Sequence, residues 1–179
     1  SCISSDTNII KSAEKLILPG VGSFKKAIAN LKKNNLFEII KDCAINKEIP
    51  ILGICLGMQL LCRSSTEDGF TEGFGFIDCP VERFNGDKCI NLKIPHVGFN
   101  EVKFIAKNKL FHGLDKKADF YFVHSYRVIF IGQPYAVGVC TYGEAFVAAF
   151  EKGHIYGTQF HPEKSQTNGL AVLKNFVNI

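Results

Sequence analysis

The sequence predicts a three-layer α/β fold in which helices cover both faces of a mostly parallel central sheet. The run from Ile49 to Ile54 is apolar without polar alternation, which is typical of a strand buried on both faces of a parallel sheet. Apolar residues at helical spacing in 36–47 and 169–177 predict helices that pack on such a sheet. A chain of 179 residues is most simply one domain, residues 1–179, which buries roughly 70% of its unfolded surface.

The remaining elements are predicted in chain order from apolar runs and turn residues. Lys15 to Leu18 form a short strand that enters the turn Pro19-Gly20-Val21-Gly22, and Ser23 is the N-cap of the helix that follows. Glycines and polar residues in 64–75 indicate loops. Further strands are predicted in 76–84, 89–92, 119–128 and 155–160, and a hairpin in 135–141 and 145–150.

Cys55 follows the central apolar run and lies between two glycines. Gly53 and Gly57 stand two residues on either side of it, the spacing of a nucleophile elbow in which a tight turn joins a strand to a helix. A cysteine at a helix N-terminus faces free N–H groups and the positive end of the helix dipole, so we expect the pKa of its thiol to be lowered toward neutrality. The competing interpretation is one more buried cysteine without a chemical role.

His161 is the candidate base for this nucleophile. It follows the strand predicted in 155–160, and Glu163 stands two residues further on, with Pro162 fixing φ between them. Cysteine, histidine and carboxylate together suit a triad in which the third group orients the base. A His-Pro-Glu loop by itself is more often a solvated turn, and His124 is a less favoured second base.

Five sequence segments together resemble the class I (triad) glutamine amidotransferases, and within them the HisH-type glutaminase subunits of imidazole glycerol phosphate synthase. The segments are P-G-V-G at 19–22, G-I-C-L-G-M-Q at 53–59, I-P-H-V-G-F-N at 94–100, Y-F-V-H-S-Y at 121–126 and Q-F-H-P-E-K-S at 159–165. The resemblance implies a flavodoxin-like fold from about Lys15 onward. Since similar proteins begin with a further strand and helix, it also implies that the first βα unit is missing here.

The resemblance assigns roles to residues that the sequence alone does not explain. It implies hydrolysis of L-glutamine by Cys55, His161 and Glu163, without a cofactor or metal. The other residues that it implicates fall into three groups: oxyanion-hole donors Gly22 and Leu56; substrate-binding residues Gly57, Gln59, Ser125 and Tyr126; and residues facing a partner, Phe99, Asn100, Tyr121 and Lys164.

The implied partner is a HisF-type (β/α)8 cyclase, which forms a heterodimer with the glutaminase and uses its ammonia in histidine biosynthesis. The family usually has tryptophan where this chain has Phe99, which leaves the identity of the partner open. The alternatives are a paralogue that supplies ammonia for nucleotide-sugar modification, a non-catalytic remnant, and a cysteine peptidase or γ-glutamyl hydrolase of similar fold.

Composition limits the classes of function. The chain is 46% hydrophobic and 21% charged with a net charge of +4, and it has no basic run with interleaved aromatic residues, so we expect no nucleic-acid partner. No apolar stretch approaches the ~20 residues of a membrane span. Seven cysteines without metal-ligand spacing indicate a reducing compartment, and we expect a cytoplasmic protein.

Overall fold

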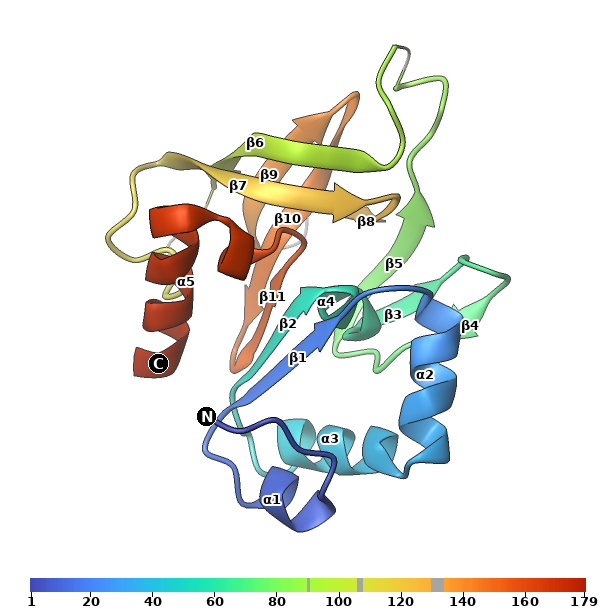
Figure 1. Ribbon diagram of the computed structural model, residues 1–179, viewed down its shortest axis with the longest axis vertical. Coiled ribbons are helices and arrows are strands. Elements are labelled where there is room, and N and C mark those ends of the chain that lie inside the picture. Colours follow the sequence, from blue (N-terminus) through green and yellow to red (C-terminus); the bar gives the residue numbers. More distant parts are fainter. Residues whose placement is uncertain (90, 106–107, 130–133) are drawn as a thin grey trace.

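A computed structural model describes residues 1–89, 91–105, 108–129 and 134–179. Over these residues the chain forms a curled mixed sheet with helices on both faces (Figure 1). The helices are α1 (Thr7–Lys11), α2 (Phe24–Lys33), α3 (Leu36–Ile45), α4 (Leu56–Leu60) and α5 (Gln166–Asn178), with a 3₁₀ turn, η1, at Pro162–Lys164. The strands are β1 (Leu16–Gly20), β2 (Ile51–Cys55), β3 (Cys62–Ser65), β4 (Thr71–Glu72), β5 (Ile77–Arg83), β6 (His96–Phe104), β7 (Lys117–His124), β8 (Tyr126–Ile129), β9 (Ala136–Tyr142), β10 (Glu144–Lys152) and β11 (Ile155–Thr158).

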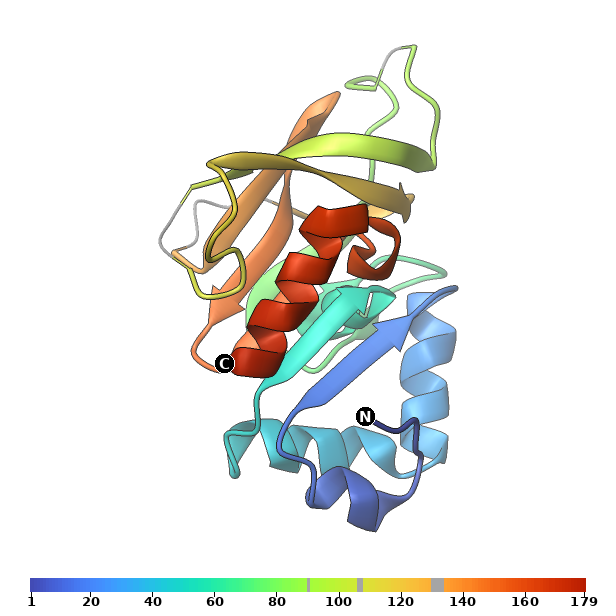
Figure 2. The ribbon, with the colours of Figure 1, turned by 60° about the vertical axis from the view of Figure 1, so that its left-hand side comes forward.

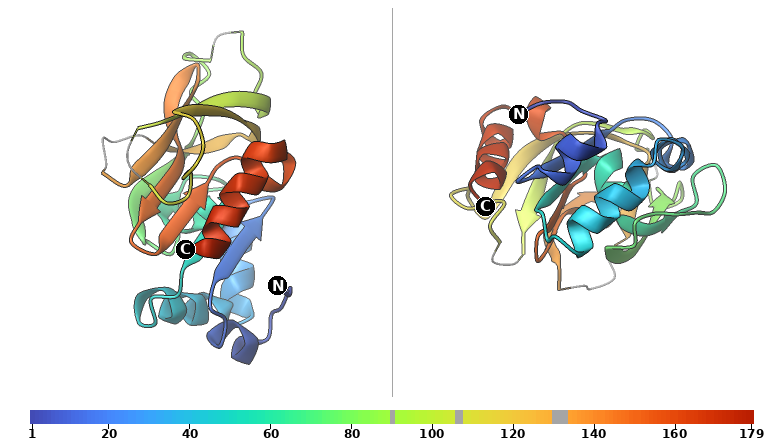
Figure 3. Two further views of the ribbon diagram at one scale, coloured as in Figure 1. Left: turned by 90° about the vertical axis from the view of Figure 1, so that its left-hand side faces the viewer. Right: turned by 90° about the horizontal axis from the view of Figure 1, so that it is seen from below.

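Strand β2 lies at the centre of the parallel part of the sheet. It pairs in parallel with β1 on one side and with β11 on the other. Its side chains alternate between two hydrophobic clusters: Ile51 packs with α2 and α3, whereas Leu52 and Ile54 pack with α5. Figure 2 and the right panel of Figure 3 show α5 on one side of these strands and α3 on the other. The predicted three-layer α/β arrangement is therefore confirmed.

Beyond β11 the strands pair mainly antiparallel. The path β11-β10-β8-β5 is antiparallel throughout, and β9, β6 and β7 branch from β10 as a second antiparallel arm. The hairpin predicted in 135–150 is confirmed as β9 and β10, which pair antiparallel because a tight turn joins them. The sheet as a whole is mixed, with its parallel strands around the elbow.

Several local predictions were wrong. Residues 89 and 91–92 form a turn and no strand, while Ile90 lies outside the described residues. Residues 96–100 of the segment 94–100, expected to be a loop facing a partner, form the first half of β6. The end of β3 and the whole of β4 lie in the stretch 64–75, which was expected to be irregular. These short strands form because β3 pairs with both β4 and β5. No helix in the described ranges has the length and apolar character that crossing a membrane requires.

The elbow glycines allow α4 to lie directly against the sheet. A Cβ atom on Gly57 would stand 1.7 Å from the carbonyl oxygen of Leu18 in β1, and one on Gly53 would stand 2.6 Å from the backbone nitrogen of Met58. The neighbouring atoms are backbone atoms, which cannot move aside as the end of a flexible side chain can. Glycine at these two positions is thus a requirement of packing.

We expect Gly57→Ala to destabilise the protein by about 3 kcal/mol or more, because the new methyl group overlaps the backbone of β1. Urea denaturation followed by circular dichroism measures this change. Gly86→Ala is the matched control, since a Cβ there meets no atom within 4 Å. Equal midpoints for the two variants would contradict the packing role of Gly57.

Candidate active site

Cys55 ends strand β2 in a strained backbone conformation. Its φ of 54° and ψ of −109° are unusual for a residue with a side chain, and α4 begins at the next residue. This is the strand-turn-helix geometry of a nucleophile elbow, so the elbow predicted from the glycine spacing is present. The sequence could show it because the two glycines and the apolar run are all local.

The surroundings of the Cys55 sulfur are nearly closed. The Sγ atom donates to the carbonyl oxygen of Val123 at 3.9 Å and receives the Nε2–H of Gln159 at 3.8 Å. Burial raises the pKa of the thiol to about 11, and the hydrogen bond from the Leu56 N–H counteracts this only in part. The expectation of a lowered pKa was wrong, because desolvation outweighs the N–H groups of a helix of five residues.

His161 and Glu163 are joined as the triad hypothesis predicts. The Nδ1 atom of His161 lies 2.7 Å from a carboxylate oxygen of Glu163, and the histidine is buried while the glutamate side chain is 49% exposed. The Nε2 atom of His161 is buried, and no hydrogen-bond partner for it lies within the described ranges. The carboxylate therefore fixes one ring nitrogen, and the other remains available for proton transfer.

Two elements hold the His161 turn next to the elbow. Thr158 in β11 is the register partner of Ile54 in β2, so both strands leave the same edge of the sheet just before His161 and Cys55. The backbone N–H of His161 donates to the carbonyl of Tyr121 in β7. Ser165 Oγ donates to the carbonyl of His161 and accepts from the N–H of Tyr121. These bonds hold the turn against β7 without using the His161 imidazole.

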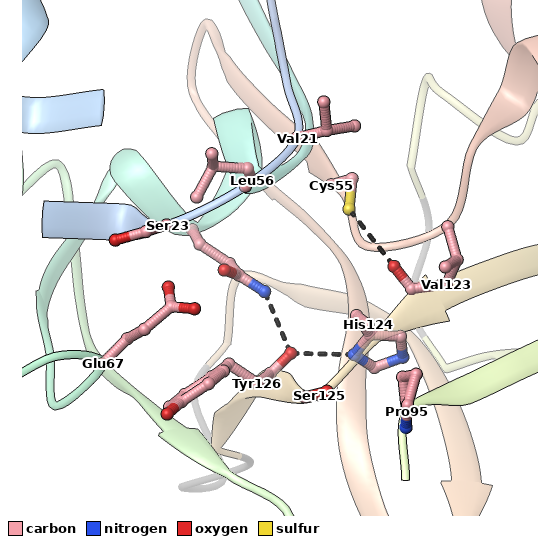
Figure 4. Close-up of a pocket in the computed structure, with 12 residues that line it drawn as sticks. Val21, Ser23, Cys55, Leu56, Glu67, Pro95, Val123, His124, Ser125 and Tyr126 are labelled. Carbon is pink, nitrogen blue, oxygen red and sulfur yellow. Dashed lines mark hydrogen bonds between the residues drawn. The ribbon is translucent and has the colours of Figure 1, made fainter. Parts of the chain in front are cut away.

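A cavity of about 480 Å³ opens beside Cys55 (Figure 4). Its lining comes from the β1–α2 turn, the elbow and α4, the loop after β3, the residue before β6, and the β7–β8 junction: Val21, Gly22, Ser23, Cys55, Leu56, Gln59, Glu67, Pro95, Val123, His124, Ser125 and Tyr126. Both residues expected to form the oxyanion hole are among them, and Gly22 has a φ of +101°. Such a volume suits a small amino acid.

The structure brings three of the four residues expected to bind substrate to the cavity wall. Gln59, Ser125 and Tyr126 line it, and the Nε2–H of Gln59 donates to the Tyr126 carbonyl at 2.9 Å. Gly57 is absent from the wall and packs against β1. Its assignment to substrate binding therefore stays a prediction, whereas its packing against β1 is plain in the structure.

Sequence reasoning missed two polar residues of the site. Glu67 brings a carboxylate to the wall, where it accepts from the Phe24 N–H at the start of α2, and no local pattern pointed to it. Gln159 connects Gln59 to the cysteine sulfur through its side-chain amide. A signal existed for Gln159, since it is a polar residue directly after a buried strand and two residues before the candidate base.

The residues expected to face a partner divide between two sides of β6. Phe99 is 51% exposed, stacks edge-on with Tyr121 across the strands, and Lys164 Nζ lies 5.8 Å from the Tyr121 ring centre. Asn100 instead bonds to the ring of His96 and the carbonyl of Thr141. Neighbouring residues of a strand point to opposite faces, so Asn100 lies on the other side of β6 from Phe99, and its place at a partner interface stays a prediction.

The pattern of the family described as glutamine amidotransferase class-I matches residues 3–179. The chain belongs to this family. Among curated class-I amidotransferases, the chain is 46% identical over 177 residues to imidazole glycerol phosphate synthase subunit HisH 1 of Campylobacter jejuni strain RM1221, covering 99% of this chain and 87% of that protein. It is 42% identical over 177 residues to subunit HisH of Escherichia coli strain K12, covering 99% and 86%.

Solved structures of class-I amidotransferases share the fold. A protein described as glutamine amidotransferase superimposes with a TM-score of 0.71 at 14% identity over 97% of this chain and 85% of its own. The glutaminase domain of Trypanosoma brucei CTPS gives 0.64 at 16% identity over 96% and 74%. At such identities the likeness supports the fold alone.

Proposed function

We propose that this chain is the glutaminase subunit of an imidazole glycerol phosphate synthase and hydrolyses L-glutamine to glutamate and ammonia. The observation that carries the proposal is the meeting of a strained elbow cysteine and a carboxylate-held histidine at one sheet edge, in a chain 46% identical to a HisH subunit. We treat residues 1–179 as one amidotransferase domain, in keeping with the span of the family match.

In the first half of the reaction, Cys55 is the nucleophile and His161 the base. His161 Nε2 takes the thiol proton as Sγ bonds to the side-chain amide carbon of glutamine, and the carbonyl electrons move onto oxygen. The N–H groups of Gly22 and Leu56 donate to this oxyanion, each worth about 3 kcal/mol in the transition state. His161 then returns the proton to nitrogen, the C–N bond breaks, and ammonia leaves.

In the second half, water hydrolyses the thioester. His161 removes a proton from water as its oxygen attacks the acyl carbon, and the same oxyanion donors act again. The C–S bond breaks, glutamate leaves, and Cys55 recovers its proton from the imidazolium. Glu163 keeps the ring in one tautomer and stabilises its charged form in both halves.

The cavity wall offers groups for the amino-acid end of glutamine. The Glu67 carboxylate suits the α-ammonium group, and polar groups of Gln59, Ser125 and Tyr126 lie along the same wall. The opposite charges of Glu67 and an ammonium group favour substrates with a free α-ammonium group over simple amides. This chemistry supports glutamine over an ordinary peptide bond, whose α-nitrogen is acylated.

The exposed cluster of Phe99, Tyr121 and Lys164 is the surface that we propose for the HisF-type (β/α)8 cyclase. It adjoins the catalytic turn, because Tyr121 accepts from the His161 N–H and Lys164 follows Glu163. A partner there could receive ammonia before it is protonated in water. Free cysteines among the described residues favour a reducing compartment, and we place the complex in the cytoplasm.

The test measures glutamate release from glutamine by this chain alone and after mixing with a HisF-type cyclase and its phosphoribosyl ligand. We expect release that rises at least about tenfold in the mixture, since a partner on this face stabilises the productive geometry. A folded chain that releases no glutamate in either case would refute the glutaminase assignment. Release that the cyclase leaves unchanged would point to another ammonia acceptor, such as a nucleotide-sugar enzyme.

A further inference from the structure

Two buried histidines face each other next to the cavity. His96 begins β6 and His124 ends β7, and they are register partners in this antiparallel pair. Both are almost fully buried, and the Nδ1 atom of His96 lies 3.1 Å from the Nε2 atom of His124. Neither takes part in the chemistry proposed above. Buried polar groups in such a position need a reason, because an apolar pair would fill the same space without polar atoms to satisfy.

The hydrogen bonds around the pair allow one arrangement of protons. The Nδ1 atom of His124 lies 2.8 Å from the carbonyl oxygen of Tyr126, which can only accept, so this nitrogen carries the proton. The other nitrogen of neutral His124 then accepts, and His96 must donate to it from Nδ1. The remaining nitrogen of His96 accepts from the Asn100 side-chain amide at 3.4 Å. Every hydrogen bond in the chain is therefore donated toward Tyr126: by Asn100 to His96, by His96 to His124, and by His124 to the Tyr126 carbonyl. We call this chain of hydrogen bonds the relay.

The environment keeps both rings neutral. Burial lowers the pKa of His96 to about 4 and that of His124 to about 3. His96 stacks between Phe122 and Tyr142, with ring centres 4.8 and 4.0 Å away, and Phe84 lies 5.2 Å from His124. These aromatic rings fix the position of each imidazole. The face of an aromatic ring is a much weaker hydrogen-bond acceptor than a carbonyl oxygen, so it does not draw the imidazole N–H groups away from the bonds described above. Both rings are therefore neutral near pH 7, and the direction of the hydrogen bonds is determined there.

The relay ends on the wall of the cavity. The Tyr126 carbonyl accepts from both His124 and Gln59. Figure 4 shows its bond to His124. The same Gln59 amide donates to Gln159, whose own amide group reaches the Cys55 sulfur. The segment 123–126 also contributes the Val123 carbonyl that holds the thiol. The Tyr126 carbonyl therefore links the histidine pair to the cavity wall. Through the side-chain amides of Gln59 and Gln159 it is also linked to the Cys55 sulfur.

We propose that His96 and His124 act as a pair of positioning residues that hold the 123–126 wall of the glutamine cavity through the Tyr126 carbonyl. This inference rests on the proposed function, because it assigns the pair to substrate binding at the same site. The pair itself touches no reacting atom. Its effect is to keep the wall in one position, so that glutamine meets a preformed surface.

The arrangement of protons can be tested without any activity. Nitrogen-15 spectra of the histidine rings distinguish a nitrogen that carries a proton from one that does not. In the wild-type chain we expect both rings to be neutral and protonated on Nδ1 between pH 6 and 8. A ring protonated on Nε2, a charged ring or a mixture of tautomers would overturn the relay, whether or not the chain hydrolyses glutamine.

His96→Phe tests the positioning role. Phenylalanine keeps the ring stacked between Phe122 and Tyr142 but removes the donor, which leaves the buried Nε2 atom of His124 without a partner. We expect the KM for glutamine to rise about tenfold while kcat stays within about threefold, since the wall shifts but the triad is intact. His96→Gln, which keeps a donor and an acceptor, should recover most of the loss.

Phe104→Leu is the matched control, because it removes an aromatic ring from the far end of the same strand, contacts neither histidine and removes no hydrogen bond. Its KM should stay within about twofold of the wild-type value. An unchanged KM in folded His96→Phe, or an equal rise in Phe104→Leu, would overturn the proposal. If the wild-type chain hydrolyses no glutamine, the proposed function fails, whereas the nitrogen spectra still decide the relay.

Discussion

Cys55→Ala is expected to lower the rate of glutamine hydrolysis by about 10⁴-fold or more, because no thioester can form without the sulfur. The structure supports an effect of this size. The strained backbone at Cys55 places its side chain at the edge of the cavity, and no other cysteine of the described residues lines the cavity. Steady-state glutamate release, measured with the cyclase partner present, gives the ratio.

Cys140→Ala is the matched control for this variant. Cys140 is equally buried but lies in β9, on the antiparallel arm and away from the cavity lining. We expect its activity to stay within about twofold of the wild-type value. Hydrolysis by Cys55→Ala at more than about a hundredth of the wild-type rate would show that a different residue or bound water performs the attack.

His161→Gln is expected to lower the rate at pH 7 by about 10³ to 10⁴-fold. The raised pKa of Cys55, about 11, means that about one thiol in 10⁴ is ionised at neutral pH, so attack depends on a base that removes the proton. Without His161 the thiolate forms only by ionisation in water. The rate of the variant should therefore rise about tenfold for each pH unit up to about pH 11.

The wild-type rate should be far less dependent on pH around neutrality, because His161 removes the thiol proton within the complex. Rates of glutamate release between pH 7 and 9 distinguish the two profiles. His112→Gln is a suitable control, since His112 is exposed and lies outside the cavity lining. Parallel pH profiles for His161→Gln and the wild type would contradict the role of His161 as the base for Cys55.

The sequence predicted the elements that local chemistry determines. Apolar residues without alternation gave β2, glycine spacing gave the elbow at Cys55, and Ser23 was correctly predicted as the N-cap of α2, where its side chain accepts from the Lys26 N–H. The contact between His161 and Glu163 spans two residues, so a proline-fixed turn could specify it. In each case the signal and its structural consequence lie within a few residues of each other.

The tertiary structure decided the properties that depend on residues far apart in the chain. The Cys55 pKa rises because burial desolvates the thiol, at a place where β7 and the segment after β11 meet the elbow, and no helix-terminus argument includes that burial. Gly57 packs against β1 because a distant backbone comes within the reach of a single methyl group. Desolvation and close packing depend on which segments meet, and local spacing carries no information about that.

The face of β6 on which each side chain lies was decided in the same way. Phe99 and Asn100 are neighbours in sequence and were predicted to face the same partner. Because side chains alternate along a strand, Phe99 lies in the exposed cluster, whereas Asn100 bonds to His96 of the histidine pair. The pair itself exists only because β6 and β7 align His96 with His124. The sequence by itself thus determined the candidate nucleophile, its candidate base and the local turns that present them, and the sheet register decided what surrounds and positions them.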